Sequence, residues 1–227
     1  MGFAVAFVLA LVLGDGRFAV ASAQTFFTND PDYLFMQHIG NQRYSPAAAS
    51  IIARFFQKRN PRLSFPTAHA YARRILKASR TQGVDPLLVA AIVVKESNAN
   101  PKDRWGGCIG LMQIKWKAHR LSIPKAFPGV RSEKDLYSPY HNIDIGTYIF
   151  ANYLRLSRFD TDAALNRYKG AENTPYKRHI RNLYGQLLAS FRREMPGLAA
   201  STAPRPVISV VPIRPLSFTQ TPYKKTP

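Results

Sequence analysis

The pattern of apolar and polar positions becomes helical from residue 67 onward. In residues 67–81 the basic side chains lie mostly opposite an apolar face, as in an amphipathic helix. Gly83 marks the predicted end of this helix. The apolar face is formed by Ala70, Tyr71, Ile75, Leu76 and Ala78.

A second and more apolar helix is predicted over residues 86–98. Asp85 is a candidate N-cap, and Pro86 stands at the first helical position, where its fixed φ and missing N–H are tolerated. Residues 87–94 are apolar nearly all round the helix. We therefore expect a central buried helix with Glu96 close to its end.

Three more helices are predicted, over residues 142–157, from about 160 to 168, and over 175–193. A glycine-rich turn at 106–110 precedes the segment 111–114, and the prolines of 121–139 indicate a loop. We find no convincing alternating pattern of a β-strand. The expected fold class is therefore all-α, with one helical domain over residues 65–193.

The segments that flank this domain differ from it in composition. Residues 3–13 are apolar but too few to span a bilayer, and Ala21-Ser22-Ala23 fits a cleavage site, so residues 1–23 are interpreted as a signal peptide. No Lys or Arg precedes the apolar stretch, which is atypical. Residues 24–64 are expected to be an N-terminal extension with a short helix near 47–57. Residues 194–227, rich in proline and basic residues, are expected to be a disordered tail.

The chain has 32 basic and 13 acidic residues and a formal net charge of +19. Such a field favours a polyanionic partner: nucleic acid, anionic lipid or an acidic cell-wall polymer. No helix-turn-helix or RNA-binding signature is present, so we expect no nucleic acid partner. Cys108 is the only cysteine, which excludes an intramolecular disulfide, and the histidine spacing fits no metal motif. We expect no metal and no cofactor.

Glu96 is the candidate catalytic residue. It follows Val89, Ile92 and Val93 by seven, four and three residues, so it shares their face of the helix. Burial of a carboxyl group raises its pKa, and a raised pKa allows general acid catalysis near neutral pH. Glycosidases use such a group to protonate the leaving oxygen. The alternative is a glutamate at a helix end whose side chain reaches solvent or pairs with Lys95.

The chain resembles the soluble lytic transglycosylase domain family, whose fold is similar to goose-type lysozyme. The resemblance covers about 120 residues and rests on four pieces in the family's order and spacing. These are Glu96-Ser97-x-x-x-Pro101, Gly107-x-x-Gly110-Leu111-Met112-Gln113-Ile114, Leu136-x-x-Pro139-x-x-Asn142-Ile143-x-x-Gly146, and Ala164-Leu165-x-x-Tyr168-x-Gly170 followed by Tyr176.

The resemblance implies a lysozyme-like helical domain with a cleft that binds peptidoglycan glycan strands. Glu96 matches the acid of the family. It would protonate the glycosidic oxygen between N-acetylmuramic acid and N-acetylglucosamine and then take the proton of the muramoyl C6 hydroxyl. The product would be a 1,6-anhydro sugar, formed without water and with a single carboxylate. An exported enzyme of this kind would lie in the periplasm, associated with the wall, and we expect a monomer.

The resemblance also implies substrate-binding residues. Gln113 matches a glutamine that lines the sugar site, and Tyr168 matches a tyrosine that faces the acid across the cleft. Met112 would form cleft wall, and Asn142 matches a motif position with a mixed, partly structural role. Ser97, next to the acid, completes this expected set.

Four positions depart from the family's pattern. Trp116 and Ala118 stand where a proline and a threonine are often found, and the other two departures are basic. Arg104 stands where a serine is common, and Lys169 replaces an asparagine. Both are expected to bring positive charge near the cleft, either to bind carboxylates or as signs of an altered site. Trp105, beside the glycine turn, is the best aromatic candidate for stacking on a sugar.

Alternative functions remain open at this stage. A lysozyme-type hydrolase on the same fold would need a second carboxylate, for which Asp103, Asp135 and Asp144 are the candidates, although caps and loops are their more ordinary roles. A non-catalytic peptidoglycan-binding protein is the other alternative. The basic, proline-rich tail suits docking to a secretion or cell-wall complex.

Overall fold

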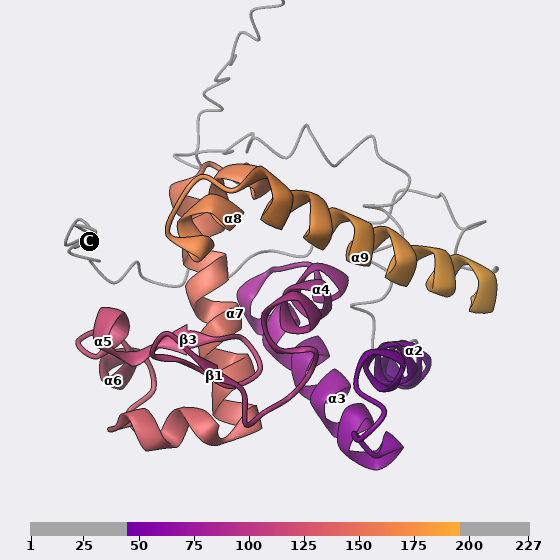
Figure 1. The fold of residues 1–227 in the computed structure, drawn as a ribbon, viewed down its shortest axis with the longest axis horizontal. Coiled ribbons are helices and arrows are strands. Elements are labelled where there is room, and N and C mark those ends of the chain that lie inside the picture. Colours follow the sequence, from indigo (N-terminus) through magenta and orange to yellow (C-terminus); the bar gives the residue numbers. More distant parts are fainter. Residues whose placement is uncertain (1–44, 196–227) are drawn as a thin grey trace, which may run out of the picture.

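The computed structural model describes residues 45–195, and Figure 1 shows its elements. Long helices form most of the described chain, which confirms the expected all-α class. The helices are α2 (Ser45–Arg59), α3 (Phe65–Gln82), α4 (Pro86–Ser97), α5 (Trp116–His119), α6 (Ile123–Ala126), the 3-10 helix η2 (Glu133–Tyr137), α7 (Pro139–Leu156), α8 (Thr161–Lys169) and α9 (Thr174–Glu194). The strands are β1 (Arg104–Trp105), β2 (Cys108–Ile109) and β3 (Ile114–Lys115).

Capping residues set the boundary between α3 and α4, as predicted. Gly83 ends α3 in the left-handed conformation, with φ at 67°. The Asp85 carboxylate accepts hydrogen bonds from the backbone N–H groups of Leu87 at 2.7 Å and Leu88 at 3.2 Å. Pro86 occupies the first turn of α4. The helix start and stop signals of this segment are therefore confirmed.

Helix α4 is the central buried helix. Val89, Ile92 and Val93 have no exposed surface. The helix packs against α9, α3 and α2, and Figure 1 shows it between α9 and α3. The predicted burial of this segment is confirmed, and its last turn holds Glu96 half-buried.

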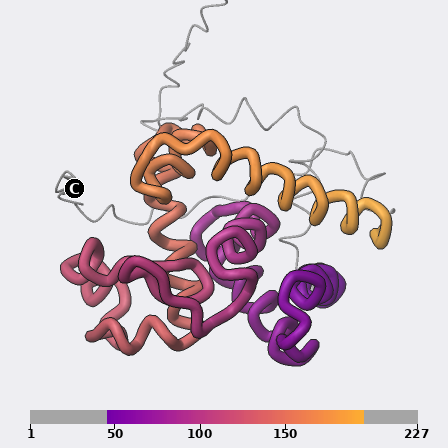
Figure 2. The backbone as a smooth tube through the Cα atoms, in the orientation of Figure 1, coloured from indigo at the N-terminus to yellow at the C-terminus, as the bar shows by residue number. Residues whose placement is uncertain are grey.

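Helix α2 belongs to the same core, although it lies within the segment 24–64 that was expected to be an extension. Ile52 and Phe56 are fully buried. The helix packs mainly on α3 and also touches the far end of α9 (Figure 2). Its amphipathic face therefore continues the hydrophobic core of the helices that follow.

The small antiparallel sheet that follows α4 was not predicted. Its strands pair in the order β1-β2-β3, and each has two residues. A strand of two residues is too short to show an alternating pattern, so the sequence gives no signal for it. The sheet is a folded-back loop that brings residues 104–115 onto the helices.

The predicted C-terminal helices are confirmed, with shifted ends. Helix α7 begins at Pro139, before the predicted residue 142, because the Ser138 hydroxyl caps it by accepting from the His141 N–H. Residues 121–139, predicted as loop, contain the short helices α6 and η2. Pro124 lies in the first turn of α6, where proline is tolerated.

Several expectations concern parts of the chain outside the described residues. The signal peptide of residues 1–23, the segment 24–44 and the tail beyond residue 195 all lie there. Among residues 45–195, no helix combines the length and the apolar character needed to cross a membrane.

Candidate active site

Glu96 lies half-buried in the last turn of α4. Its carboxylate oxygen Oε1 accepts a hydrogen bond from the Tyr176 hydroxyl, with 2.5 Å between the oxygens. Burial raises the pKa of Glu96 above its ordinary value, while the Tyr176 hydrogen bond, Lys169 and Lys95 oppose part of this rise. The expected direction of the shift, and desolvation as its cause, are confirmed.

Tyr176 is held rigidly beside the acid. It lies in the first turn of α9, which Asn173 caps by accepting from the Tyr176 N–H at 2.9 Å. The amino groups of Lys95 and Lys169 lie 5.8 and 5.5 Å from the centre of its ring, within cation–π range. Burial and the charge of Glu96 raise the pKa of the phenol, so Tyr176 stays neutral and donates a hydrogen bond to the carboxylate.

Hydrogen bonds tie the end of α4 to the turn formed by residues 110–113. The Ser97 hydroxyl donates to the carbonyl of Leu111 at 2.9 Å. The Asn142 side-chain amide donates to the carbonyls of Ile109 at 2.8 Å and Leu136 at 2.9 Å, and its oxygen accepts from the Met112 N–H at 2.8 Å. Ser97 and Asn142 thus position backbone, and both side chains are buried.

Two glycines allow this turn to pack closely against α7. A Cβ on Gly110, where φ is +77°, would lie 2.4 Å from the Asn142 amide nitrogen. A Cβ on Gly146 of α7 would lie 2.5 Å from the sulfur of Met112. Met112 is fully buried, so its side chain packs in the core and does not form the exposed cleft wall that was expected.

Tyr168, expected to face the acid, makes its hydrogen bond elsewhere. Its hydroxyl donates to the carbonyl of Met112 at 2.8 Å, and its ring packs edge-on against Phe150. The charge of Glu96 contributes to the raised pKa of Tyr168, so the two groups are near each other. In this structure the hydroxyl that contacts Glu96 belongs to Tyr176.

Comparison with known proteins agrees with this geometry. The family model described as "Transglycosylase SLT domain" matches residues 73–179. Residues 73–179 are thus similar to the transglycosylase SLT domain family. The match spans α4, the turn formed by residues 110–113, α7, α8 and the first turns of α9. It therefore contains every group described above around Glu96.

Curated relatives are similar to part of this chain. "Membrane-bound lytic murein transglycosylase C" from Salmonella arizonae is 34% identical over 87 residues, which are 37% of this chain and 24% of the relative. "Endo-type membrane-bound lytic murein transglycosylase A" from Cronobacter sakazakii is 34% identical over 91 residues, which are 39% of this chain and 45% of the relative. The matched regions thus cover less than half of either relative.

The Gln113 side chain closes the turn formed by residues 110–113 with hydrogen bonds to two backbone carbonyls. Its amide nitrogen donates to the carbonyls of Asp103 at 3.1 Å and Gly110 at 3.0 Å. Its backbone has a φ of 47°, in the left-handed region that costs a non-glycine residue energy. These bonds hold the side chain in one place, partly exposed beside the turn.

Arg104 and Lys169, the two basic departures from the family's pattern, have different partners. Arg104 forms an ion pair with Glu133 at 2.7 Å and donates to the Tyr137 hydroxyl at 3.2 Å, so its charge is paired with a carboxylate of η2. Lys169 instead lies against Tyr176 and lowers the pKa of Glu96. Trp105, next to Arg104, is 78% exposed and is free to stack on a ligand.

Two of the carboxylates that a hydrolase would enlist, Asp135 and Asp144, have structural partners. Asp135 accepts from the N–H groups of Arg131 and Ser132 at the start of η2. Asp144 pairs with Arg74. Within residues 45–195, the groups that shift the pKa of Glu96 are a tyrosine and two lysines.

Within residues 45–195, the site includes neither a metal-binding cluster nor an activated thiol. In the described part of the chain, no three His, Cys, Asp or Glu side chains are grouped so that they could hold a metal ion. The thiol of Cys108 is half-buried, and burial raises its pKa, which makes it less reactive.

Tyr176 belongs to the motif that resembles the family, but no role was predicted for it. A usable signal was present, because Tyr176 is followed at helical spacing by Ile180, Leu183 and Leu187, the buried stripe of α9. A tyrosine on such a stripe points inward, toward the apolar helix that carries Glu96.

Proposed function

We propose that this protein is a peptidoglycan lytic transglycosylase that cleaves the β-1,4 bond between N-acetylmuramic acid and N-acetylglucosamine without water. One observation carries the proposal: Glu96 is a half-buried carboxyl with a raised pKa, held by a neutral tyrosine hydroxyl. The SLT domain match and the names of the two relatives, both lytic murein transglycosylases, support the same reaction.

In the first step, protonated Glu96 donates its proton to the glycosidic oxygen while the bond from that oxygen to C1 of the muramoyl residue breaks. In the second step, the Glu96 carboxylate takes the proton of the C6 hydroxyl, whose oxygen bonds to C1. The carboxyl group is then protonated again, and the product is a 1,6-anhydro sugar. Because the C6 oxygen replaces water, one carboxylate suffices where hydrolases use two.

The surroundings of Glu96 suit both steps. A raised pKa keeps the carboxyl protonated for the first. Once the proton has left, the Tyr176 hydroxyl and the charges of Lys169 and Lys95 stabilise the carboxylate. Tyr176 acts as a positioning residue that fixes the direction of Oε1. Gln113 and Trp105 are proposed to contact the sugar, whereas Ser97, Met112, Asn142 and Tyr168 hold the turn behind it.

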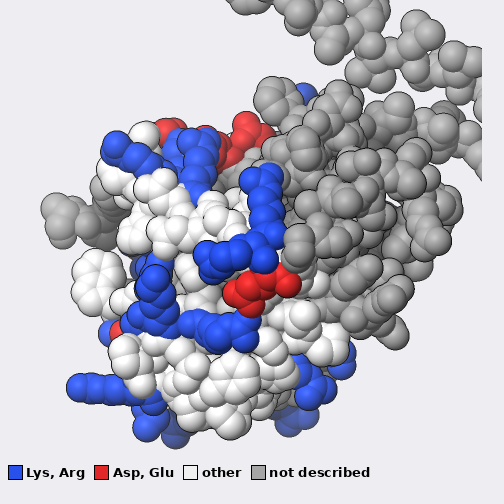
Figure 3. Space-filling view, turned by 90° about the vertical axis from the view of Figure 1, so that its right-hand side faces the viewer, with Lys and Arg blue, Asp and Glu red and all other residues white. Residues whose placement is uncertain are grey.

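The charge of the molecule fits a substrate that carries many carboxylates. Between residues 61 and 195, 23 basic residues face 10 acidic residues. On the face drawn in Figure 3, Lys and Arg side chains spread over the surface around a small acidic group. We place the protein in the periplasm at the wall, as a monomer, with its proline-rich tail as a docking segment for a secretion or cell-wall complex.

Digestion of purified peptidoglycan by the wild-type protein and by Glu96→Gln, with mass spectrometry of the soluble products, tests the proposal. Anhydromuropeptides from the wild type alone are expected. Products with reducing ends would favour a lysozyme-type hydrolase. Binding of both proteins to the wall without any product would mean a peptidoglycan-binding protein.

Deletion of residues 196–227 tests the proposed role of the tail. Unchanged localisation and unchanged capture of a partner would exclude its role as a docking segment.

A further inference from the structure

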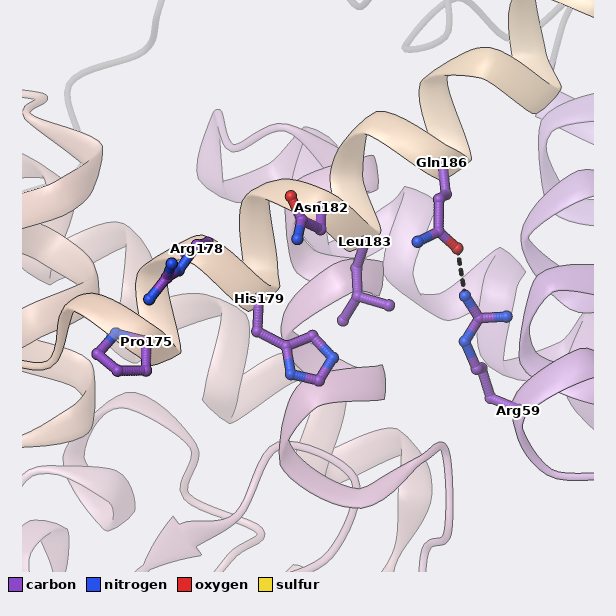
Figure 4. Close-up of a pocket in the computed structure, with 7 residues that line it drawn as sticks. All are labelled: Arg59, Pro175, Arg178, His179, Asn182, Leu183 and Gln186. Atoms are coloured by element: carbon purple, nitrogen blue, oxygen red, sulfur yellow. Dashed lines mark hydrogen bonds between the residues drawn. The ribbon is translucent and has the colours of Figure 1, made fainter.

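A hollow lies outside the groups around Glu96, between the end of α2 and α9. Its volume is about 410 Å³. Pro175, Arg178, His179, Asn182 and Leu183 line it from α9, and Arg59 closes it from α2 (Figure 4). We call this hollow the α9 groove.

The α9 groove is positively charged, and no acidic residue lines it. Arg59 is fixed there, because its guanidinium lies 4.6 Å from the centre of the Phe55 ring and donates to the side-chain oxygen of Gln186. Arg178 and His179 are exposed on α9. Burial lowers the pKa of His179, and the charges of Lys95 and Arg59 lower it further. Both cations therefore act on the imidazole of His179.

The positive charge of the groove is continuous with the groups around Glu96. Tyr176, which donates to Glu96, precedes His179 by one helical turn on α9. Lys95 links the two places, since its amino group lies 5.8 Å from the Tyr176 ring and its charge acts on His179. A ligand bound at Glu96 can therefore extend into the groove without leaving this positive field.

We propose that the α9 groove binds the carboxylates of the peptide stem attached to the glycan strand that Glu96 cleaves. The assignment rests on the proposed function, which supplies the strand. Carboxylates are the acidic groups that a muramoyl peptide carries, and guanidinium groups recognise them with paired N–H donors. The exposed amides of Asn182 and Gln186 are suited to the peptide backbone, which offers both donors and acceptors.

Binding, measured without turnover, tests this assignment. Each protein carries Glu96→Gln, and its affinity is measured for glycan strands with peptide stems and for strands stripped of stems by an amidase. The groove variant is Arg59→Gln with Arg178→Glu. The matched control is Lys77→Gln with Arg80→Glu, which makes the same charge change on exposed positions of α3.

The groove variant is expected to bind stem-bearing strands about fivefold more weakly, the scale of exposed ion pairs, and stripped strands unchanged. The control is expected to bind both alike, and the difference should shrink at high salt. Equal weakening on both strands would show a general attraction and overturn the assignment. Full affinity of the groove variant for both strands would overturn it too, in favour of another occupant such as an acidic protein segment.

A second readout does not depend on the proposed function. Free stem peptide is titrated into the wild-type protein while the imidazole signals of His179 and His119 are followed by NMR. His119 is the internal control, because it lies outside the groove. A saturable shift of His179 alone is expected, and the groove variant should lose it. No shift at His179 would overturn the assignment, even if the protein proved to cleave glycan strands.

Discussion

At the scale of single residues, the chemistry depends on how Tyr176 and two lysines surround Glu96. The Tyr176 hydroxyl and the lysine charges favour the ionised carboxylate, while burial favours the protonated acid. The balance decides up to which pH Glu96 keeps the proton that the first step needs. Changes at these neighbours are therefore expected to move the pH profile of the enzyme.

Tyr176→Phe removes the hydroxyl that donates to Glu96 and keeps the ring. Without this donor the pKa of Glu96 rises further, so the activity loss on the alkaline side moves to higher pH. The maximal rate falls about tenfold, because a hydrogen bond to a charged group is worth about 1.5 kcal/mol or more. Tyr168→Phe is the control: it loses a bond to the Met112 carbonyl and should leave the pH profile in place. Superimposable profiles for wild type and Tyr176→Phe would contradict this role.

Lys169→Asn restores the residue usual in the family. The lysine charge lowers the pKa of Glu96, so its removal raises that pKa and shifts the alkaline limb of the rate profile to higher pH. The maximal rate should stay within about twofold, since exposed charges contribute little to geometry. Lys102→Asn, in the exposed loop after α4, serves as the comparison and should shift nothing. A Lys169→Asn limb at the wild-type pH would refute the electrostatic role.

At the scale of elements, the contact between the turn at 110–113 and α7 holds the site together. Asn142 and Gly146 of α7, three and seven residues after the start of that helix, receive the backbone and the Met112 side chain of the turn. Several residues of the family motif, such as Asn142 and Gly146, therefore serve close packing and not the reaction itself.

Gly146→Ala tests this packing. The added methyl group would overlap Met112, so the free energy of unfolding should fall by about 1–3 kcal/mol, and activity with it. Gly185→Ala, in the middle of α9, is the matched control because nothing lies within 4 Å of its added Cβ. That change should stabilise by about 0.5–1 kcal/mol through helix propensity. Chemical denaturation measures both, and equal effects would argue against a close contact at Gly146.

The N-cap of α4 makes stability depend on pH. Burial raises the pKa of Asp85 to about 6, against about 3.9 in an unfolded chain. Between these values the folded protein binds more protons than the unfolded chain, so this contribution to stability falls as pH rises through the window. Asp85→Asn should remove that component, measured by urea unfolding from pH 4 to pH 7.5. Asp160→Asn, at the exposed cap of α8, should keep it, and an unchanged profile in Asp85→Asn would disprove the assignment.

At the scale of the whole molecule, helices could be predicted and the pairing of side chains could not. The capping signals at Gly83, Asp85 and Pro86 are local, so they located α3 and α4 from the sequence. The partner of Glu96 depends on how α9 crosses α4, which no local pattern records. The family resemblance implied that Tyr168 faces the acid, whereas in the structure the Tyr168 hydroxyl donates to the Met112 carbonyl and the Tyr176 hydroxyl contacts Glu96.

The same limit applies to α2 and the sheet. Helix α2 was recognised as a helix but set apart from the domain, because its packing on α3 is a tertiary contact. The sheet of residues 104–115 was not predicted, because strands of two residues show no alternating pattern in the sequence. The roles of Gln113 and Trp105 in substrate binding stay predictions that a bound glycan would test.

The central claim is that Glu96 cuts the glycan strand without using water. The most direct test is digestion of peptidoglycan by the wild-type protein in water labelled with oxygen-18, followed by mass spectrometry of the released muropeptides. We predict anhydromuropeptides that contain no label, because the oxygen that bonds to C1 comes from the C6 hydroxyl of the same sugar. Reducing-end products that carry the label at C1 would show that water is the nucleophile and would contradict the account.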